Sequence, residues 1–213
     1  MGLCIFFDLI YIKCYEKNKY FIGLFAKVIA AFCFITIGYM AYLDKNSLFY
    51  HYILLGLIFG GIGDLFLALK NLIAKNVMFI IGTISFLVGH ILYLRALFLL
   101  DNYYLVDCLI GGVLFGTITF SFLDKICRLN KYFKVIGIVY MMMISIMVAM
   151  SIGAYLSNPN ISNVIFMIGA ILFVSSDIIL SIYNFSKKEK WMHPVYSLLY
   201  FIAQILISFS LHI

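Results

Sequence analysis

The sequence predicts an all-α protein, a polytopic transmembrane bundle of about eight helices. Two observations carry this prediction. The 213 residues are 65% hydrophobic and only 11% charged, with a mean hydropathy of +1.11, and the apolar residues form continuous runs separated by short polar connections. Soluble domains average about 45–50% apolar and about 25% charged residues. The composition therefore excludes soluble enzymes, nucleic-acid-binding proteins and disordered chains, and residues 1–213 are expected to form a single integral membrane domain.

Seven runs are long enough to cross a bilayer, which takes about 20 apolar helical residues. Their continuity favours helices over barrel strands, which alternate and are only about ten residues long. A shorter run, Leu3–Ile12, precedes them and carries Asp8. Lysines follow it instead of a small-residue cleavage site, so we expect a thin, uncleaved first helix. The seven long runs are, in order, Phe21–Leu43, Leu48–Leu69, Val77–Leu100, Tyr104–Leu123, Val135–Leu156, Ile161–Tyr183 and Val195–Leu211.

Basic residues are concentrated in alternate connections. Twelve of the 15 Lys and Arg follow the first, third, fifth and seventh helices, whereas the intervening connections carry only Lys45. Cytoplasmic loops carry such an excess, so these four connections are predicted to be cytoplasmic and the C-terminus to lie on the far side. The Ile-, Phe-, Lys- and Asn-rich composition is typical of an AT-rich bacterial genome, which favours a bacterial cell membrane as the location. The twelve are Lys13, Lys17, Lys19, Lys70, Lys75, Lys125, Arg128, Lys131, Lys134, Lys187, Lys188 and Lys190.

Cysteines and histidines offer little for a metal site. The five cysteines contain no CxxC pair, and four lie in or beside apolar runs, which indicates free thiols. Of the four histidines only His90 lies deep in a run, so a multi-histidine zinc site lacks ligands. We expect no metal, although one histidine with two aspartates remains an alternative ligand set.

Four ionisable residues lie well inside the predicted helices: Lys27, Asp64, His90 and Asp177. Each such charge costs about 2.5–3.5 kcal/mol on translocon scales, so each needs a reason. At about 1.5 Å per residue, Lys27 and Asp64 lie roughly 9–11 Å from the cytoplasmic boundary, Asp177 about 15 Å, and His90 near mid-membrane. We therefore expect these groups to meet in one cavity in the cytoplasmic half.

Small and polar residues at a spacing of four place these groups on inward faces. Gly56, Gly60 and Asp64 share one face, and Tyr200 and Gln204 share another on the last helix. The bland alternatives are that the polar residues only hold helices together and that Lys27 and Asp64 form a structural ion pair. Similar Gly63-Asp64-Leu65 and Ser176-Asp177-Ile178 motifs suggest a four-plus-four parallel repeat.

Two carboxyl groups in a water-poor cavity suit acid–base chemistry. In different surroundings Asp64 and Asp177 can hold different protonation states and divide the roles of acid and base, as hydrolysis of an acid-labile ether requires. A GxSxG nucleophile motif is absent from the sequence. The rival hypothesis is a lipid or solute carrier in which Asp64, Asp177 and Lys27 form a proton relay or an ion site.

Four motifs then occur in order: GDLFL at 63–67, FLVGHILYLRAL at 86–97, SSDIILSIYNF at 175–185 and YFIAQILISFSL at 200–211. Together they resemble the lysoplasmalogenase (YhhN-like) family of multi-pass membrane proteins, over about Lys27 to Leu211. That family usually has Lys-Pro where this chain has Lys27-Val28. The departure affects a helix kink more than the charge.

The resemblance implies hydrolysis of the sn-1 vinyl ether of a lysophospholipid substrate, the lysoplasmalogen, without a cofactor. Its products are a fatty aldehyde and glycerophosphoethanolamine or glycerophosphocholine. Asp64 and Asp177 would be the acid–base pair, with Lys27 and His90 tuning charge. The residues expected to orient water and substrate are Tyr93, Tyr140, Tyr200 and Gln204.

The expected partners are the lysophospholipid and the surrounding membrane lipids, and not a nucleic acid. The substrate would enter sideways between helices, with its phosphate near Lys70, Lys75 and Lys187. Alternatively these lysines only set the topology. A hydrolase acting on a different lysolipid is the remaining alternative, because no residue here distinguishes a vinyl ether from an ester or amide.

Overall fold

The computed structural model describes residues 1–73, 76–127, 129 and 131–213. Two residues of the basic connections, Lys75 and Arg128, lie outside these ranges. The described residues form eight helices and no strand, which confirms the predicted fold class. The helices are α1 (Gly2–Glu16), α2 (Tyr20–Lys45), α3 (Leu48–Ile73), α4 (Asn76–Leu97), α5 (Leu105–Cys127), α6 (Lys131–Ser157), α7 (Ile161–Phe185) and α8 (Met192–Ser210).

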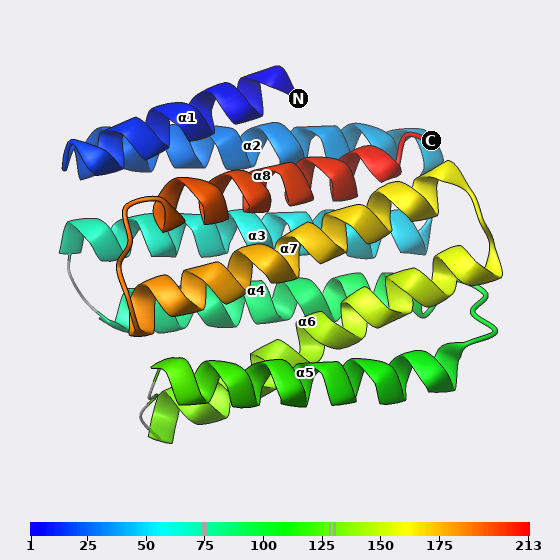
Figure 1. Ribbon diagram of the computed structural model, residues 1–213. Helices are drawn as coiled ribbons and strands as arrows, with labels where there is room; N and C mark the ends of the chain where they lie inside the picture. The colour runs from blue at the N-terminus through cyan, green and yellow to red at the C-terminus, as the bar shows by residue number, and fades with distance from the viewer. Residues whose placement is uncertain (74–75, 128, 130) are drawn as a thin grey trace.

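Helices α2 to α8 are each long and apolar enough to cross a membrane, which confirms the seven predicted spans. Helix α1 has 15 residues and runs along α2 over part of its length (Figure 1). Several helices extend beyond their apolar runs; α6, for example, begins at Lys131 and not at Val135. A lysine at a helix end can stay helical because its side chain reaches the headgroup region.

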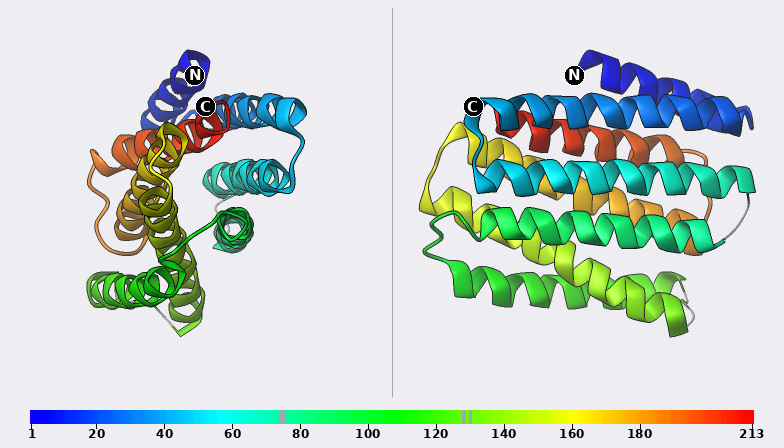
Figure 2. Two further views of the ribbon diagram at one scale, coloured as in Figure 1. Left: turned by 90° about the vertical axis from the view of Figure 1, so that its right-hand side faces the viewer. Right: turned by 180° about the vertical axis from the view of Figure 1, so that it is seen from behind.

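Successive helices run in opposite directions, so the helix ends that flank the four basic connections lie at one end of the bundle (Figure 1). We call this the basic end; the C-terminus lies at the other (Figure 1). Helix α8 packs against α1, α2, α3 and α7 and is therefore central to one half of the bundle. Helices α5 and α6 form a hairpin at the opposite edge (Figure 2). The proposed four-plus-four repeat stays a prediction.

Glycines set the closest helix contacts. A Cβ atom added to Gly112 on α5 would lie 2.6 Å from the Cα atom of Ile146 on α6, and one on Gly116 would lie 2.9 Å from the Cα atom of Met142. On α3, a Cβ atom at Gly60 would lie 2.5 Å from Gln204 Nε2. The small-residue face predicted for this helix is confirmed as a packing face, since small residues let helix backbones approach closely.

We predict that Gly112→Leu destabilises the protein, because the new side chain must displace the α6 backbone. Overpacking of this kind costs about 1–3 kcal/mol. The neighbouring Gly111→Leu is the matched control, since a Cβ atom there meets nothing within 4 Å. The thermal unfolding midpoints of the two purified variants in detergent should differ clearly. Equal midpoints would contradict the close α5–α6 contact.

Candidate active site

Two aspartates from different helices face one buried cavity. Asp64 on α3 and Asp177 on α7 line it together with Lys27 on α2 and Tyr200 on α8. The exposed fractions are 1% for Asp64, 6% for Asp177 and 5% for Lys27, so these ionisable groups are removed from lipid and water alike. Three of the four ionisable residues expected to meet in one cavity therefore do so, whereas His90 does not line it.

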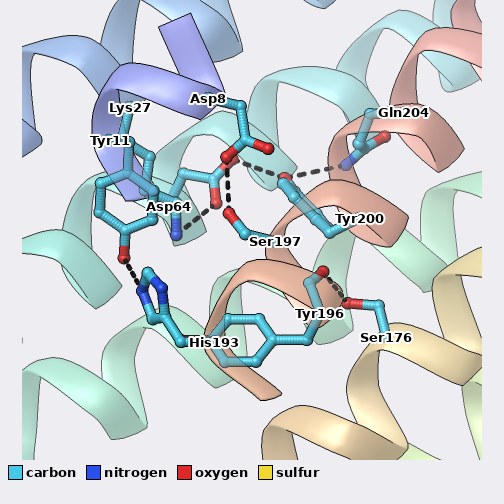
Figure 3. A network of polar contacts seen from close by, with 10 residues as sticks. All are labelled: Asp8, Tyr11, Lys27, Asp64, Ser176, His193, Tyr196, Ser197, Tyr200 and Gln204. Carbon is cyan, nitrogen blue, oxygen red and sulfur yellow. Dashed lines mark hydrogen bonds and ion pairs between the residues drawn. The ribbon is translucent and has the colours of Figure 1, made fainter. Parts of the chain in front are cut away.

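Asp64 is held by a cation and a hydroxyl group (Figure 3). Its Oδ1 lies 3.0 Å from Lys27 Nζ, and its Oδ2 accepts a hydrogen bond of 2.6 Å from the hydroxyl of Tyr200. The amide of Gln204 donates to that hydroxyl oxygen at 3.2 Å, and the hydroxyl of Tyr93 donates to Gln204 Oε1 at 2.9 Å. This chain of donors stabilises Asp64 as a carboxylate.

Asp177 has different surroundings. Its Oδ2 accepts a hydrogen bond of 2.6 Å from the hydroxyl of Tyr140, whose oxygen lies 3.2 Å from His90 Nε2. That nitrogen is 4.0 Å from Asp177 Oδ2. Within the described residues no Lys or Arg forms an ion pair with Asp177. The two carboxyl groups therefore share a cavity but differ in their partners, as division of acid and base roles requires.

Helix α1 adds groups for which the sequence analysis proposed no role. Asp8 is fully buried and its Oδ1 accepts a hydrogen bond of 2.6 Å from Ser197, which lines the shared cavity (Figure 3). The ring of Tyr11 lies 5.1 Å from Lys27 Nζ, and its hydroxyl lies 3.4 Å from His193 Nε2. The sequence did single out Asp8, because it is the one charge inside a short apolar run. Nothing in the sequence pointed to a role for His193, which lies beside a basic connection.

The predicted substrate-orienting residues fall into two groups. Tyr200 lines the shared cavity, and Tyr140 lines an adjoining apolar cavity together with Asp177. Tyr93 and Gln204 are 1% and 0% exposed and lie behind Tyr200, so they contact the site through its hydroxyl. His90 likewise packs behind the site, its ring 4.7 Å from that of Phe173.

The three lysines expected near a phosphate differ in position. Lys70 Nζ donates a hydrogen bond of 2.7 Å to Asn184 and lies 4.5 Å from the centre of the Phe79 ring. Lys187 is exposed, and Lys75 lies outside the described residues. In the part of the chain that the structure describes, no three His, Cys, Asp or Glu residues form a metal-binding group, and all five cysteines are free thiols, as predicted.

A family model, described as the YhhN family, matches residues 22–211. The chain belongs to the YhhN family. This is the lysoplasmalogenase family, so the chain is a membrane protein of that family. No curated protein and no solved structure matches the chain. Lys27, Asp64, His90 and Asp177 lie within the residues matched to the YhhN family, whereas α1 with Asp8 lies before them.

We predict that Lys27→Met destabilises this YhhN protein strongly, because it leaves the charge of Asp64 buried without its cation. Removing one partner of a buried ion pair costs about 3–5 kcal/mol. The double variant Lys27→Met/Asp64→Leu should regain much of that loss, since it removes both charges. Thermal unfolding in detergent measures the effect. If the losses of the two single variants simply add in the double variant, the ion pair is not the cause.

Proposed function

We propose that this protein is a membrane hydrolase that cleaves the sn-1 vinyl ether of lysoplasmalogens. The products would be a fatty aldehyde and glycerophosphoethanolamine or glycerophosphocholine. The observation that carries the proposal is that Asp64 and Asp177 line one buried cavity with unlike partners. Membership of the lysoplasmalogenase family supports the reaction class.

In this proposal Asp177 is the acid. Hydrolysis of a vinyl ether begins when a proton is added to the β-carbon. A buried carboxyl group without a cation favours its neutral form, and the hydroxyl of Tyr140 occupies Oδ2. Oδ1 would therefore carry the proton. The electron pair of the C=C bond takes this proton, forms the new C–H bond and leaves an oxocarbenium ion and the Asp177 carboxylate.

Asp64 would act as the base. Its carboxylate, held by Lys27 and Tyr200, stabilises the oxocarbenium ion by its negative charge and accepts a proton from the water that attacks the α-carbon. Asp177 then takes the proton of the hemiacetal hydroxyl as the carbonyl group forms. Asp64 returns its proton to the leaving glycerol oxygen as the C–O bond breaks. Both carboxyl groups end in their starting states, and one water has been consumed.

We expect Asp64→Asn and Asp177→Asn to lower aldehyde release by at least about 100-fold, since general acid–base catalysis contributes about 100- to 10,000-fold. The assay is aldehyde formation from lysoplasmenylcholine by the purified protein in detergent. Asp124→Asn is the control, because the half-buried Asp124 pairs with Lys134 at 2.8 Å and lines neither cavity. Folded wild-type protein that releases no aldehyde but mediates proton-coupled uptake into liposomes would support the carrier instead.

We also expect the loss of kcat to become smaller along the hydrogen-bonded series from Tyr200 through Gln204 to Tyr93. Tyr200→Phe removes a donor to Asp64 and should lower kcat by about tenfold or more, because a hydrogen bond to a charged group contributes about 1.5–3 kcal/mol. Tyr93→Phe reaches Asp64 only through Gln204 and Tyr200. Its kcat should stay within a few-fold of wild type. Equal losses in kcat would indicate a shared structural role.

A further inference from the structure

A second cavity adjoins the site and is almost wholly apolar. It lies between α4, α5, α6 and α7, with Leu67 of α3 also in its wall. Five phenylalanines contribute to it: Phe79, Phe86, Phe120, Phe133 and Phe185. Such a lining favours a hydrocarbon ligand, because ligand pockets lined mainly by apolar and aromatic side chains bind apolar groups.

Two polar residues of this cavity belong to the candidate active site. Asp177 and Tyr140 both line it, and Asp177 also lines the cavity that it shares with Asp64. Leu67, Phe86 and Leu180 belong to both cavities. A hydrocarbon chain bound in the apolar cavity would therefore contact the carboxyl group that we propose as the acid.

The cavity faces the side of the bundle. Helices α4 and α5 both line it, yet they do not pack against each other in the ranges that the structure describes. Seen along the bundle, α5 stands apart from α4, whereas α6 packs against α4 (Figure 2). Ile80 and Thr83 on α4 and Phe120 on α5 are half-buried at this side. An opening between two membrane-spanning helices leads to lipid and not to water.

A cation stands near the cavity at the basic end. Phe79, whose ring lies beneath Lys70 Nζ, lines both the apolar cavity and a smaller one whose wall includes Lys70, Asn71 and Asn184. No carboxylate pairs with Lys70 among the described residues. The charge of Lys70 is thus available to an anion that is joined to an apolar chain.

We propose that the apolar cavity holds the single hydrocarbon chain of a lysophospholipid, which enters between α4 and α5 from the leaflet at the basic end with its phosphate near Lys70. This inference rests on the proposed function, because it assigns a binding site to the hydrocarbon chain of the lysoplasmalogen. It adds the binding site and the route of access.

Cys127 provides a test that does not depend on hydrolysis, since this free thiol lines the cavity. A variant that keeps only Cys127 is reconstituted in phosphatidylcholine nanodiscs and treated with N-ethylmaleimide. The ligand is the saturated 1-O-hexadecyl lysophosphatidylcholine, which has no vinyl ether to cleave. At ten times its dissociation constant it should slow labelling by about tenfold. The hexyl analogue at the same concentration should not. A variant that keeps only Cys33, which does not line the cavity, is the control.

An unchanged labelling rate of Cys127 in the presence of the hexadecyl ligand would overturn the chain site. The hydrolysis proposal fails separately, if the natural vinyl ether yields no aldehyde while Cys127 is still protected. A second variant, Gly137→Leu, fills the cavity from its α6 wall, where an added Cβ atom would lie 3.1 Å from Phe120. It should weaken binding of the hexadecyl ligand about tenfold, because the new side chain occupies space that the ligand needs. Gly111→Leu, in open space, should leave it unchanged.

Discussion

The contact between Lys27 Nζ and Asp64 Oδ1 is the constraint on which much of this structure depends. Two opposite charges buried in a bundle are stable together only if the remaining polar atoms around them are also satisfied. That requirement brings in Tyr200 of α8, then Gln204 and Tyr93 behind it. One ion pair thereby orders α2, α3, α4 and α8 about a common point, and α1 adds the ring of Tyr11 beside Lys27.

The second aspartate, Asp177, matters because it has no paired cation among the residues that the structure describes. Asp177 has a tyrosine hydroxyl and a neighbouring histidine, but no lysine or arginine in the described chain. Helix α7 places it in the walls of both cavities, and α6 supplies its tyrosine partner. In the proposed reaction the ether bond would lie between a carboxylate paired with a lysine and a carboxyl group without one, while the lipid chain stays in the apolar cavity, which would keep bulk water away from the oxocarbenium ion.

Helix α1 shows that a site can draw on residues outside the part of the chain that resembles the family. The YhhN match begins after it, yet Asp8 and Tyr11 contact Ser197, His193 and Lys27. Asp8 is buried only because α1 packs against α2 and α8. Short apolar segments at the edge of a recognised region can thus complete a site by covering it.

Much of this could be predicted from the sequence because the bilayer imposes simple rules. Hydrophobic length determined the seven spans, and the scarcity of charges in them singled out Lys27, Asp64, His90 and Asp177, since each such charge must have a partner. Which partner each has was decided only by tertiary structure. Spacing along one helix cannot show that Tyr140 contacts Asp177 while Tyr200 contacts Asp64, or that α4 and α5, as far as the structure describes them, line one cavity without packing against each other. These contacts depend on how separate helices rotate and cross.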